Sequence, residues 1–271
     1  MRIYNIIKMT NQDFTLETYK SLLIALKKSD YEFVTFEHWC KEKKNGKIVI
    51  LRHDVDLKAI NSLRTAEIES ELGISTTYYF RVIPQSNQPE IIKSIVRLGH
   101  EVGYHYEDIS IFSGSITHAL SHFKKQLEYF RQYYPVSTIC MHGSPTSKFD
   151  NRDLWKAADY HDYKVIGEPY FDFLNIKDVE YFTDTARMWN GEKYNVRDKS
   201  INNDFTNEIN KNIHSTFDLI NWINTSENSN PVMITTHPQR WTDNKFEWTL
   251  EYIGQNLKNI IKRIIIYIRK Q

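Results

Sequence analysis

Cysteine, proline and glycine are scarce in this chain of 271 residues, which contains two, seven and nine of them respectively. Cys40 and Cys140 lie far apart and form neither a CxxC pair nor a disulfide framework, which is typical of thiols in a reducing compartment. The first residues also lack the continuous apolar run and the cleavage site of a signal peptide. We therefore predict a cytoplasmic protein.

Long apolar runs and an excess of charge of one sign are absent as well. The nearest candidate for a membrane span, 260–270, is too short and carries internal charge, so we expect a solvated C-terminus rather than contact with a membrane surface. The 35 basic and 34 acidic residues leave a net charge of +1, and no overall field attracts nucleic acid. The sequence thus predicts no membrane span and no nucleic-acid partner, and it leaves the oligomeric state open.

Strand-like and helix-like stretches alternate along most of the chain. With 41% hydrophobic residues, the chain can bury the core of one large domain, which we predict to cover residues 1–271. Such alternation favours a parallel sheet, and six or seven strands favour its closure. We therefore predict an α/β fold, a distorted (β/α) barrel of about seven parallel strands. A helical extension is expected over about 1–46, a polar excursion over 190–212 and a final helix over about 243–271. We also expect a helix over 151–162 and a short strand that begins at 165–166.

The apolar run 48–51 leads into Arg-His-Asp-Val-Asp, in which two acids are spaced two residues apart. Because side chains alternate along a strand, Asp54 and Asp56 should lie on the same face. Burying both carboxylates is unfavourable unless a cation, a shared proton or a metal lies between them, so the pair is a candidate site. An ion pair with Arg52 or a helix cap would explain the same acids without a function.

Three histidines also follow apolar strand-like runs directly, namely His105, His142 and His237. In a barrel of parallel strands all strands end at one edge, and ligands bind at that edge. The three histidines should therefore meet the two aspartates at one site.

Aspartate and histidine together favour Zn, Co, Ni, Mn or Fe over Ca and Mg, which prefer ligands that are all oxygen. A catalytic metal needs about three protein ligands and an open position for water. Asp56 and His105 fit as ligands. Asp54 is then placed to act as the general base, and His237 on another strand is placed to protonate a leaving amine. These roles predict hydrolysis of an amide or an ester.

Three segments carry a resemblance to a known family: Arg-His-Asp-Val-Asp at 52–56, Gly-His-Glu-Val-Gly-Tyr-His at 99–105 and Val-Met-Ile-Thr-Thr-His at 232–237. They resemble motifs of the polysaccharide deacetylases, the carbohydrate esterases of the NodB-homology type, and in particular those of divergent intracellular members. The resemblance covers about 47–240 and implies a NodB-like deacetylase barrel. It also implies Asp54 as base, Asp56 and His105 as metal ligands, and His237 as acid.

The chain departs from this family pattern at two places. Position 109 is Ile, where the family has a second metal-binding histidine. His142, which stands roughly where the family has an Arg-x-Pro motif, is our candidate for the missing ligand, and Glu107 is the other. The arginine that orients the base in the family is also missing from its place, and Arg187 is the candidate to substitute for it.

Further residues are predicted to bind substrate: Tyr106, Glu107, Arg187, Trp189 and Trp241. Each has a structural alternative. The tryptophans could simply cap the barrel, and Arg187 could bridge to Asp184 or Asp198. His53 should point away from Asp54 and His100 precedes its strand, so we interpret both as structural.

Together these features predict a metal-dependent N-deacetylase, a hydrolase of linear amides that acts during surface-polysaccharide assembly such as lipopolysaccharide biosynthesis. The expected substrate is an acetylated amino sugar, free or linked to a nucleotide or lipid, and the expected cofactor is zinc or another divalent transition metal. A metal-independent amide hydrolase, in which His105 and Glu107 bind substrate directly, is the first alternative. A carbohydrate-binding relative without turnover is the second, and Ile109 favours it.

Overall fold

The computed structural model describes residues 12–143, 147–189 and 212–270. Almost all of the polar excursion predicted over 190–212 lies outside these ranges. Within them, both cysteines are buried and neither forms a disulfide.

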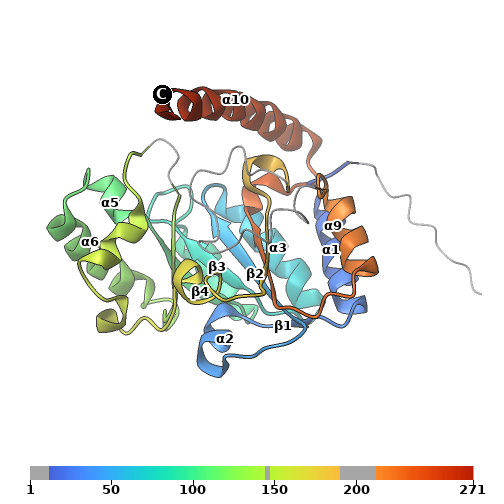
Figure 1. Ribbon diagram of the computed structural model, residues 1–271, viewed down its shortest axis with the longest axis horizontal. Helices are drawn as coiled ribbons and strands as arrows, with labels where there is room; N and C mark the ends of the chain where they lie inside the picture. The colour runs from blue at the N-terminus through green and yellow to red at the C-terminus, as the bar shows by residue number, and fades with distance from the viewer. Residues whose placement is uncertain (1–11, 144–146, 190–211, 271) are drawn as a thin grey trace, which may run out of the picture.

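The strands form one parallel sheet that curls into a half-barrel (Figure 1). Its order is β5-β4-β3-β2-β7-β6, and β1 pairs with β2 beside this path. The strands are β1 (Glu32–Phe33), β2 (Ile48–Val55), β3 (Thr77–Phe80), β4 (Glu101–Tyr106), β5 (Ile139–Met141), β6 (Glu180–Thr183) and β7 (Val232–Thr236). The prediction of an α/β fold with a distorted barrel of parallel strands is confirmed.

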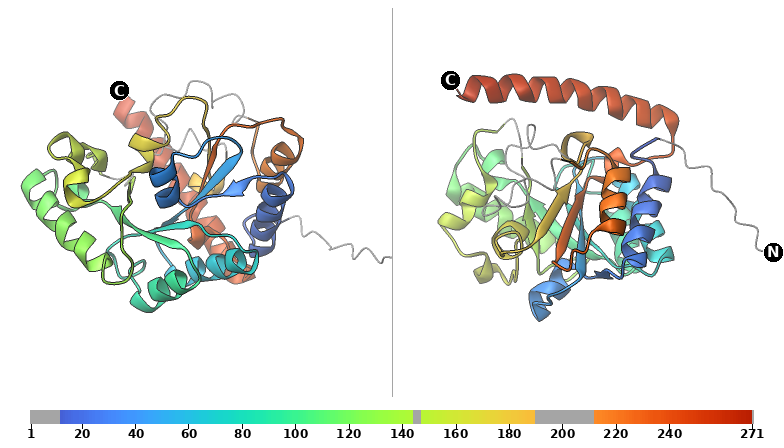
Figure 2. Two further views of the ribbon diagram at one scale, coloured as in Figure 1. Left: turned by 90° about the horizontal axis from the view of Figure 1, so that it is seen from below. Right: turned by 45° about the vertical axis from the view of Figure 1, so that its right-hand side comes forward.

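The helices pack mainly around the outside of the curled sheet, as the view from below in Figure 2 shows. They are α1 (Leu16–Lys28), α2 (Phe36–Glu42), α3 (Ala59–Glu71), α4 (Pro89–Arg97), α5 (Asp108–Ile111), α6 (Ile116–Phe130), α7 (Pro169–Asp172), α9 (Thr216–Thr225) and α10 (Lys245–Lys270). Local sequence explains their starts: the Thr15 side chain caps α1, and Ser215 with Asp218 forms a capping box on α9.

Two expected elements differ from the prediction. The helix expected over 151–162 consists of two 3-10 turns, η1 (Asn151–Lys156) and η2 (Tyr160–Tyr163). Asp150 and Asp159 each accept a hydrogen bond from the backbone N–H two residues later, which favours a tight turn over a continuous helix. The strand expected at 165–166 is reduced to a single bridge between Thr138 and Gly167.

Strand β2 is buried on both faces, and its residues alternate between two apolar clusters. Ile48 and Ile50 pack in one cluster, whereas Val49 and Leu51 pack in the other. A parallel strand covered on both sides is expected to be apolar without interruption, as this one is. The apolar run therefore fixes where β2 lies and leaves its polar end at the edge of the sheet.

The last helix, α10, lies outside the barrel on the side where β6 and β7 end (Figure 1). It contacts η3 (Thr185–Arg187) and η5 (Pro238–Arg240), the short turns that follow these two strands. Among the described residues, neither α10 nor any other helix is long and apolar enough to cross a membrane.

Candidate metal and catalytic site

Arg52 and Asp54 form a buried ion pair at the end of β2. They are two residues apart on a strand, so both side chains lie on the same face. Arg52 donates to both Asp54 carboxylate oxygens, from Nε at 3.0 Å and from Nη2 at 2.7 Å. Arg52 Nη2 also lies 3.0 Å from the Tyr170 hydroxyl oxygen. The ion pair considered for these acids is therefore present, and it holds the Asp54 carboxylate in one orientation.

Asp56, just after β2, is approached by three histidines. Nε2 of His142 and Nε2 of His105 lie 3.4 and 3.6 Å from its Oδ1, and Nε2 of His237 lies 3.8 Å from its Oδ2. The histidines lie at the ends of three different strands, β5, β4 and β7. Oδ1 of Asp56 is buried and accepts no hydrogen bond from any described residue. The structure thus brings together the strand-end residues that the sequence singles out.

The other ring nitrogen of each histidine is fixed by an oxygen acceptor. These acceptors are the Cys140 carbonyl for His105, at 2.9 Å, Glu107 Oε2 for His142, at 2.9 Å, and Asp184 Oδ1 for His237, at 2.6 Å. Because carbonyls and carboxylates only accept, Nδ1 of His105 and of His142 carries a proton and donates it. Nδ1 of His237 also lies 2.8 Å from Nη1 of Arg240, which only donates. The lone pair of a neutral His105 or His142 ring is on Nε2 and faces Asp56, as in metal-binding histidines.

Burial and neighbouring charges set the ionisation of the site. Burial lowers the pKa of His105 to about 4, so its ring is neutral near pH 7. Burial opposes ionisation of Asp56, but His142, His237 and His105 outweigh it and the pKa of Asp56 is lowered. Burial also opposes ionisation of Glu107, yet the hydrogen bond from His142 helps to lower its pKa to about 2. An ionised Asp56 therefore faces a neutral His105.

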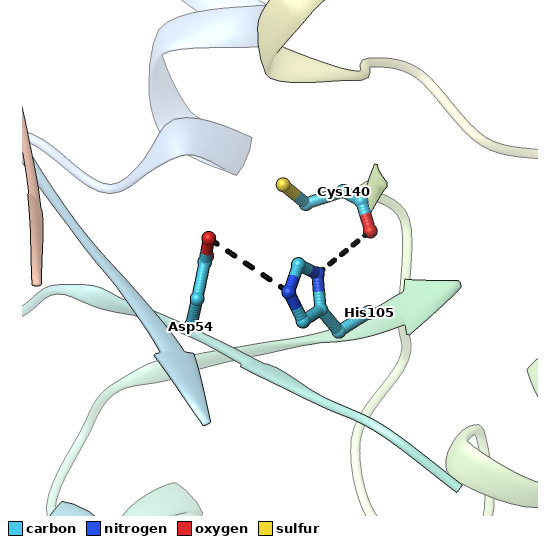
Figure 3. A group of neighbouring side chains, drawn as sticks. All are labelled: Asp54, His105 and Cys140. Carbon is cyan, nitrogen blue, oxygen red and sulfur yellow. Dashed lines mark hydrogen bonds and ion pairs between the residues drawn. The ribbon is translucent and has the colours of Figure 1, made fainter. Parts of the chain in front are cut away.

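Among the described residues, Asp54, His105 and Cys140 are the group that could hold a metal ion on the criterion that all ligand atoms lie within 4.8 Å of one another, and this group overlaps the residues around Asp56 at His105. Figure 3 shows His105 between the other two residues, with Nε2 toward Asp54 and Nδ1 toward the Cys140 carbonyl. Nε2 of His105 lies 3.8 Å from Asp54 Oδ2. A carboxylate, an imidazole and a thiol are all ligands that zinc accepts. His105 belongs to both groups.

Glu107 holds His142 in place. Arg81 donates to both Glu107 oxygens at 2.8 Å, and Oε2 also accepts from His142. Both oxygens are thus engaged, which favours His142 over Glu107 as the side chain that replaces the missing motif histidine. Ile109 itself is buried in the apolar core and offers no ligand atom.

Arg187 does not orient Asp54, so this prediction is wrong. The Arg187 guanidinium packs 4.5 Å from the Trp248 ring centroid and donates to the Arg240 carbonyl at 3.3 Å. Burial lowers its pKa to about 10. The residue that holds Asp54 is Arg52, which belongs to the same strand and was identified only as a possible structural partner.

The three aromatic residues predicted to bind substrate are buried, and their polar atoms have other partners. The contacts are Trp155 Nε1 to the Tyr106 hydroxyl at 2.9 Å, Trp189 Nε1 to Thr216 Oγ1 at 2.9 Å and Trp241 Nε1 to Asp184 Oδ2 at 2.9 Å. Tyr106 also lies on the opposite face of β4 from His105. These positions favour the structural alternative, in which the rings pack in the core.

Asp184, just after β6, is a site residue that the sequence reasoning missed. It is fully buried and accepts hydrogen bonds from the backbone N–H and Nδ1 of His237, from Trp241 and from Arg240. Burial opposes its ionisation, but Arg240 and His237 outweigh burial and lower its pKa. The rule that located the histidines, a polar residue directly after a strand, also applies to Asp184.

His53 and His100 are structural, as predicted. His53 interacts with Glu69 and Thr236 on the far face of β2, and His100 bonds to the Ala66 carbonyl. Both side chains are almost fully buried. Neither contributes to the group around Asp56.

No protein-family model matches this chain, and no curated protein matches it. The resemblance to polysaccharide deacetylases therefore rests on its three motifs, and the family stays a prediction. Function has to be inferred from the site itself.

Proposed function

We propose that this protein is a metal-dependent hydrolase that removes an N-acetyl or similar acyl group from an amino sugar, free or linked to a nucleotide or lipid. The observation that carries the proposal is the convergence of three histidine Nε2 atoms on Asp56, at 3.4 to 3.8 Å. A carboxylate oxygen that is ionised, has no hydrogen-bond donor among the described residues and faces the lone pair of a neutral imidazole calls for a cation between them.

The metal is assigned to Asp56, His105 and His142. Ligand atoms about 2.0–2.1 Å from a tetrahedral zinc lie about 3.4 Å apart. The distances from Asp56 Oδ1 to the two Nε2 atoms, 3.4 and 3.6 Å, agree with this spacing for these two pairs, whereas all three pairs lie within 4.8 Å in the group of Asp54, His105 and Cys140. In the overlapping group, by contrast, both Asp54 oxygens already accept hydrogen bonds from Arg52. Zinc suits the donors best, and Co, Ni, Mn or Fe would also be accepted.

The remaining residues divide the proton transfers between them. When bound, the metal polarises the scissile carbonyl and makes water more acidic. Asp54, held by Arg52, takes the proton of the attacking water. His237 protonates the leaving amine, and Asp184 fixes the orientation of its ring and stabilises the imidazolium. A base and an acid on separate strands are what amide hydrolysis requires, and binding alone needs neither.

An open cleft of about 370 Å³ borders Glu107 and supports a sugar substrate. Its lining includes Ser110, Ser113 and Phe149. Serine hydroxyls can hydrogen-bond to a sugar and an aromatic ring can stack on it, so these side chains suit a sugar-binding site. The motif resemblance supports the same class, an acylated amino sugar used in surface polysaccharides such as lipopolysaccharide.

Metal analysis of the purified protein tests the assignment directly. The wild-type protein should contain about one equivalent of a divalent transition metal and release acetate from an N-acetyl amino sugar. Asp56→Asn should lose both. The matched control is Asp162→Asn, which makes the same change at an exposed aspartate distant from Asp56 in the sequence. This variant should retain both its metal and acetate release.

The variant Cys140→Ser separates the two overlapping metal groups. It should keep its metal under the assignment given above and lose it if Cys140 is a ligand. Acetate release that survives complete removal of metal would refute the metal-dependent mechanism and favour the metal-independent amide hydrolase. A metal-loaded protein that binds amino sugars without turnover would favour the carbohydrate-binding alternative.

A further inference from the structure

The long helix α10 is amphipathic, but its apolar side faces away from the protein. Its large apolar residues at intervals of three or four are 52–71% exposed. They are Phe246, Leu250, Ile253, Leu257, Ile260 and Ile264, and Ile261 beside them is equally exposed. A surface helix of a globular protein normally turns such a stripe toward the core. The stripe formed by these seven residues is called the outer stripe below.

Polar residues hold the opposite side of α10 against the protein. Gln255 and Asn259 are buried, and Asn259 Nδ2 donates to the Ala186 carbonyl at 3.0 Å. Trp248 Nε1 donates to the Asp13 carbonyl at 2.7 Å. These contacts fix which side of the helix faces inward, so the outer stripe remains exposed. Its arrangement along one side of a straight helix matches helices that lie in the surface of a lipid bilayer.

The charge of α10 indicates the kind of surface that the outer stripe meets. After Glu251, every charged residue in the sequence is basic: Lys258, Lys262, Arg263, Arg269 and Lys270. Basic residues that accompany an exposed apolar stripe are typical of helices that bind anionic lipids. Figures 1 and 2 show α10 on the outside of the barrel, and none of the helices and strands described here lies over its outer side.

We propose that α10 docks this protein onto an anionic lipid surface through the outer stripe. A second copy of the chain is a weaker candidate for covering it. If α10 helices of two copies packed as an antiparallel pair, the basic C-terminal half of each helix would need to lie against the acidic residues in the N-terminal half of the other. Glu247 forms an ion pair with Arg64 of its own chain, at 3.6 Å, and Glu251 interacts electrostatically with Arg187 of its own chain. Both acids are thus oriented toward their own chain.

Docking through α10 would place the membrane on the side of the barrel where β6 and β7 end. The candidate site lies at the same strand ends, since His237 directly follows β7. The inference does not depend on the proposed function, because it uses only the exposure and charge of α10.

Flotation of the full chain with vesicles tests the proposal. The wild-type protein should float with vesicles that contain phosphatidylglycerol and bind neutral phosphatidylcholine vesicles much more weakly. Ile253→Glu/Leu257→Glu should abolish flotation. Lys258→Glu should weaken binding about fivefold or more, the contribution of one basic residue at an anionic surface. The matched control, Ile60→Glu/Ile176→Glu, places the same charges at exposed apolar positions outside α10 and should float like the wild type.

Three results would overturn the proposal. The first is a wild-type protein that stays with the soluble fraction at every lipid composition. The second is equal binding of neutral and anionic vesicles, which removes the role of charge. The third is a stable dimer in sedimentation that the Ile253→Glu/Leu257→Glu variant converts to a monomer, because the outer stripe would then be an interface between two copies.

Discussion

The ion pair between Arg52 and Asp54 allows a quantitative test, because both side chains are almost completely buried, 0% and 6% exposed. The variant Arg52→Met keeps a long side chain but removes both donors to the Asp54 carboxylate. At a charge separation of about 4 Å and an effective dielectric constant of about 20, the lost attraction is about 4 kcal/mol. This agrees with the cost of about 3–5 kcal/mol for breaking a buried pair by removing one partner.

We therefore expect the free energy of unfolding of Arg52→Met to fall by about 4 kcal/mol at pH 7, measured by urea unfolding followed with circular dichroism. The double variant Arg52→Met/Asp54→Asn should recover at least about 2 kcal/mol of this loss, because a neutral amide is less costly to bury than an unpaired carboxylate. Arg52→Lys keeps the charge but cannot donate to both oxygens in the same way. Its free energy of unfolding should lie between those of the wild-type protein and Arg52→Met.

Two outcomes would refute this reasoning. A loss below about 1 kcal/mol in Arg52→Met would mean that Asp54 is solvated or finds another donor. A double variant that loses the sum of the two single losses would mean that the residues are energetically independent. In either case Arg52 would not be the residue that holds the proposed base.

Three further predictions concern carboxylates around the site and in the core. Glu107→Gln should weaken metal binding about 10–100-fold, because His142 loses the carboxylate that accepts its Nδ1 proton. Competition with a chelating dye measures this affinity, and an unchanged affinity would exclude His142 as a ligand. Asp184→Asn should lower kcat for acetate release by up to about 100-fold, with little change in KM, because His237 loses its anionic partner. A change in KM alone would contradict the role of His237 as the general acid. Burial raises the pKa of Glu101 to about 7, so its proton stabilises the fold below pH 4.5 and this contribution is lost as the pH rises through 7. Relative to Glu101→Gln, the wild-type protein should lose up to about 3 kcal/mol of unfolding free energy between pH 5 and pH 8. If the difference in unfolding free energy between the two proteins stays constant over this range, Glu101 titrates normally.

The strand ends could be predicted from the sequence because two simple periodicities determine them. An apolar run that is buried on both faces has to stop where the sheet stops, and the polar residues that follow then lie at its edge. This reasoning placed Asp56, His105, His142 and His237 at one edge, where the structure brings them together. It also covers Asp184, which directly follows β6.

The partners of these residues could not be predicted in the same way, since they depend on how separate elements pack. Arg81 comes from the loop after β3 and reaches Glu107 after β4, and nothing in the local sequence connects them. Arg187 and Trp241 follow strands just as the histidines do, yet the turns after β6 and β7 direct them into the core. Similarly, the period of apolar residues in α10 predicts a helix but not which side of it faces the protein.

The orientation of His105 supports a metal rather than a proton as the cation of the proposed site. A protonated histidine that bridges to Asp56 is the explanation that needs no metal. It does not apply to His105, because burial lowers its pKa to about 4 and its Nδ1 proton is already donated to the Cys140 carbonyl. Its Nε2 therefore presents a lone pair to the Asp56 carboxylate oxygen, 3.6 Å away. Two acceptors at this distance are stabilised by a cation that both can bind, and a divalent metal with nitrogen and oxygen ligands meets that condition.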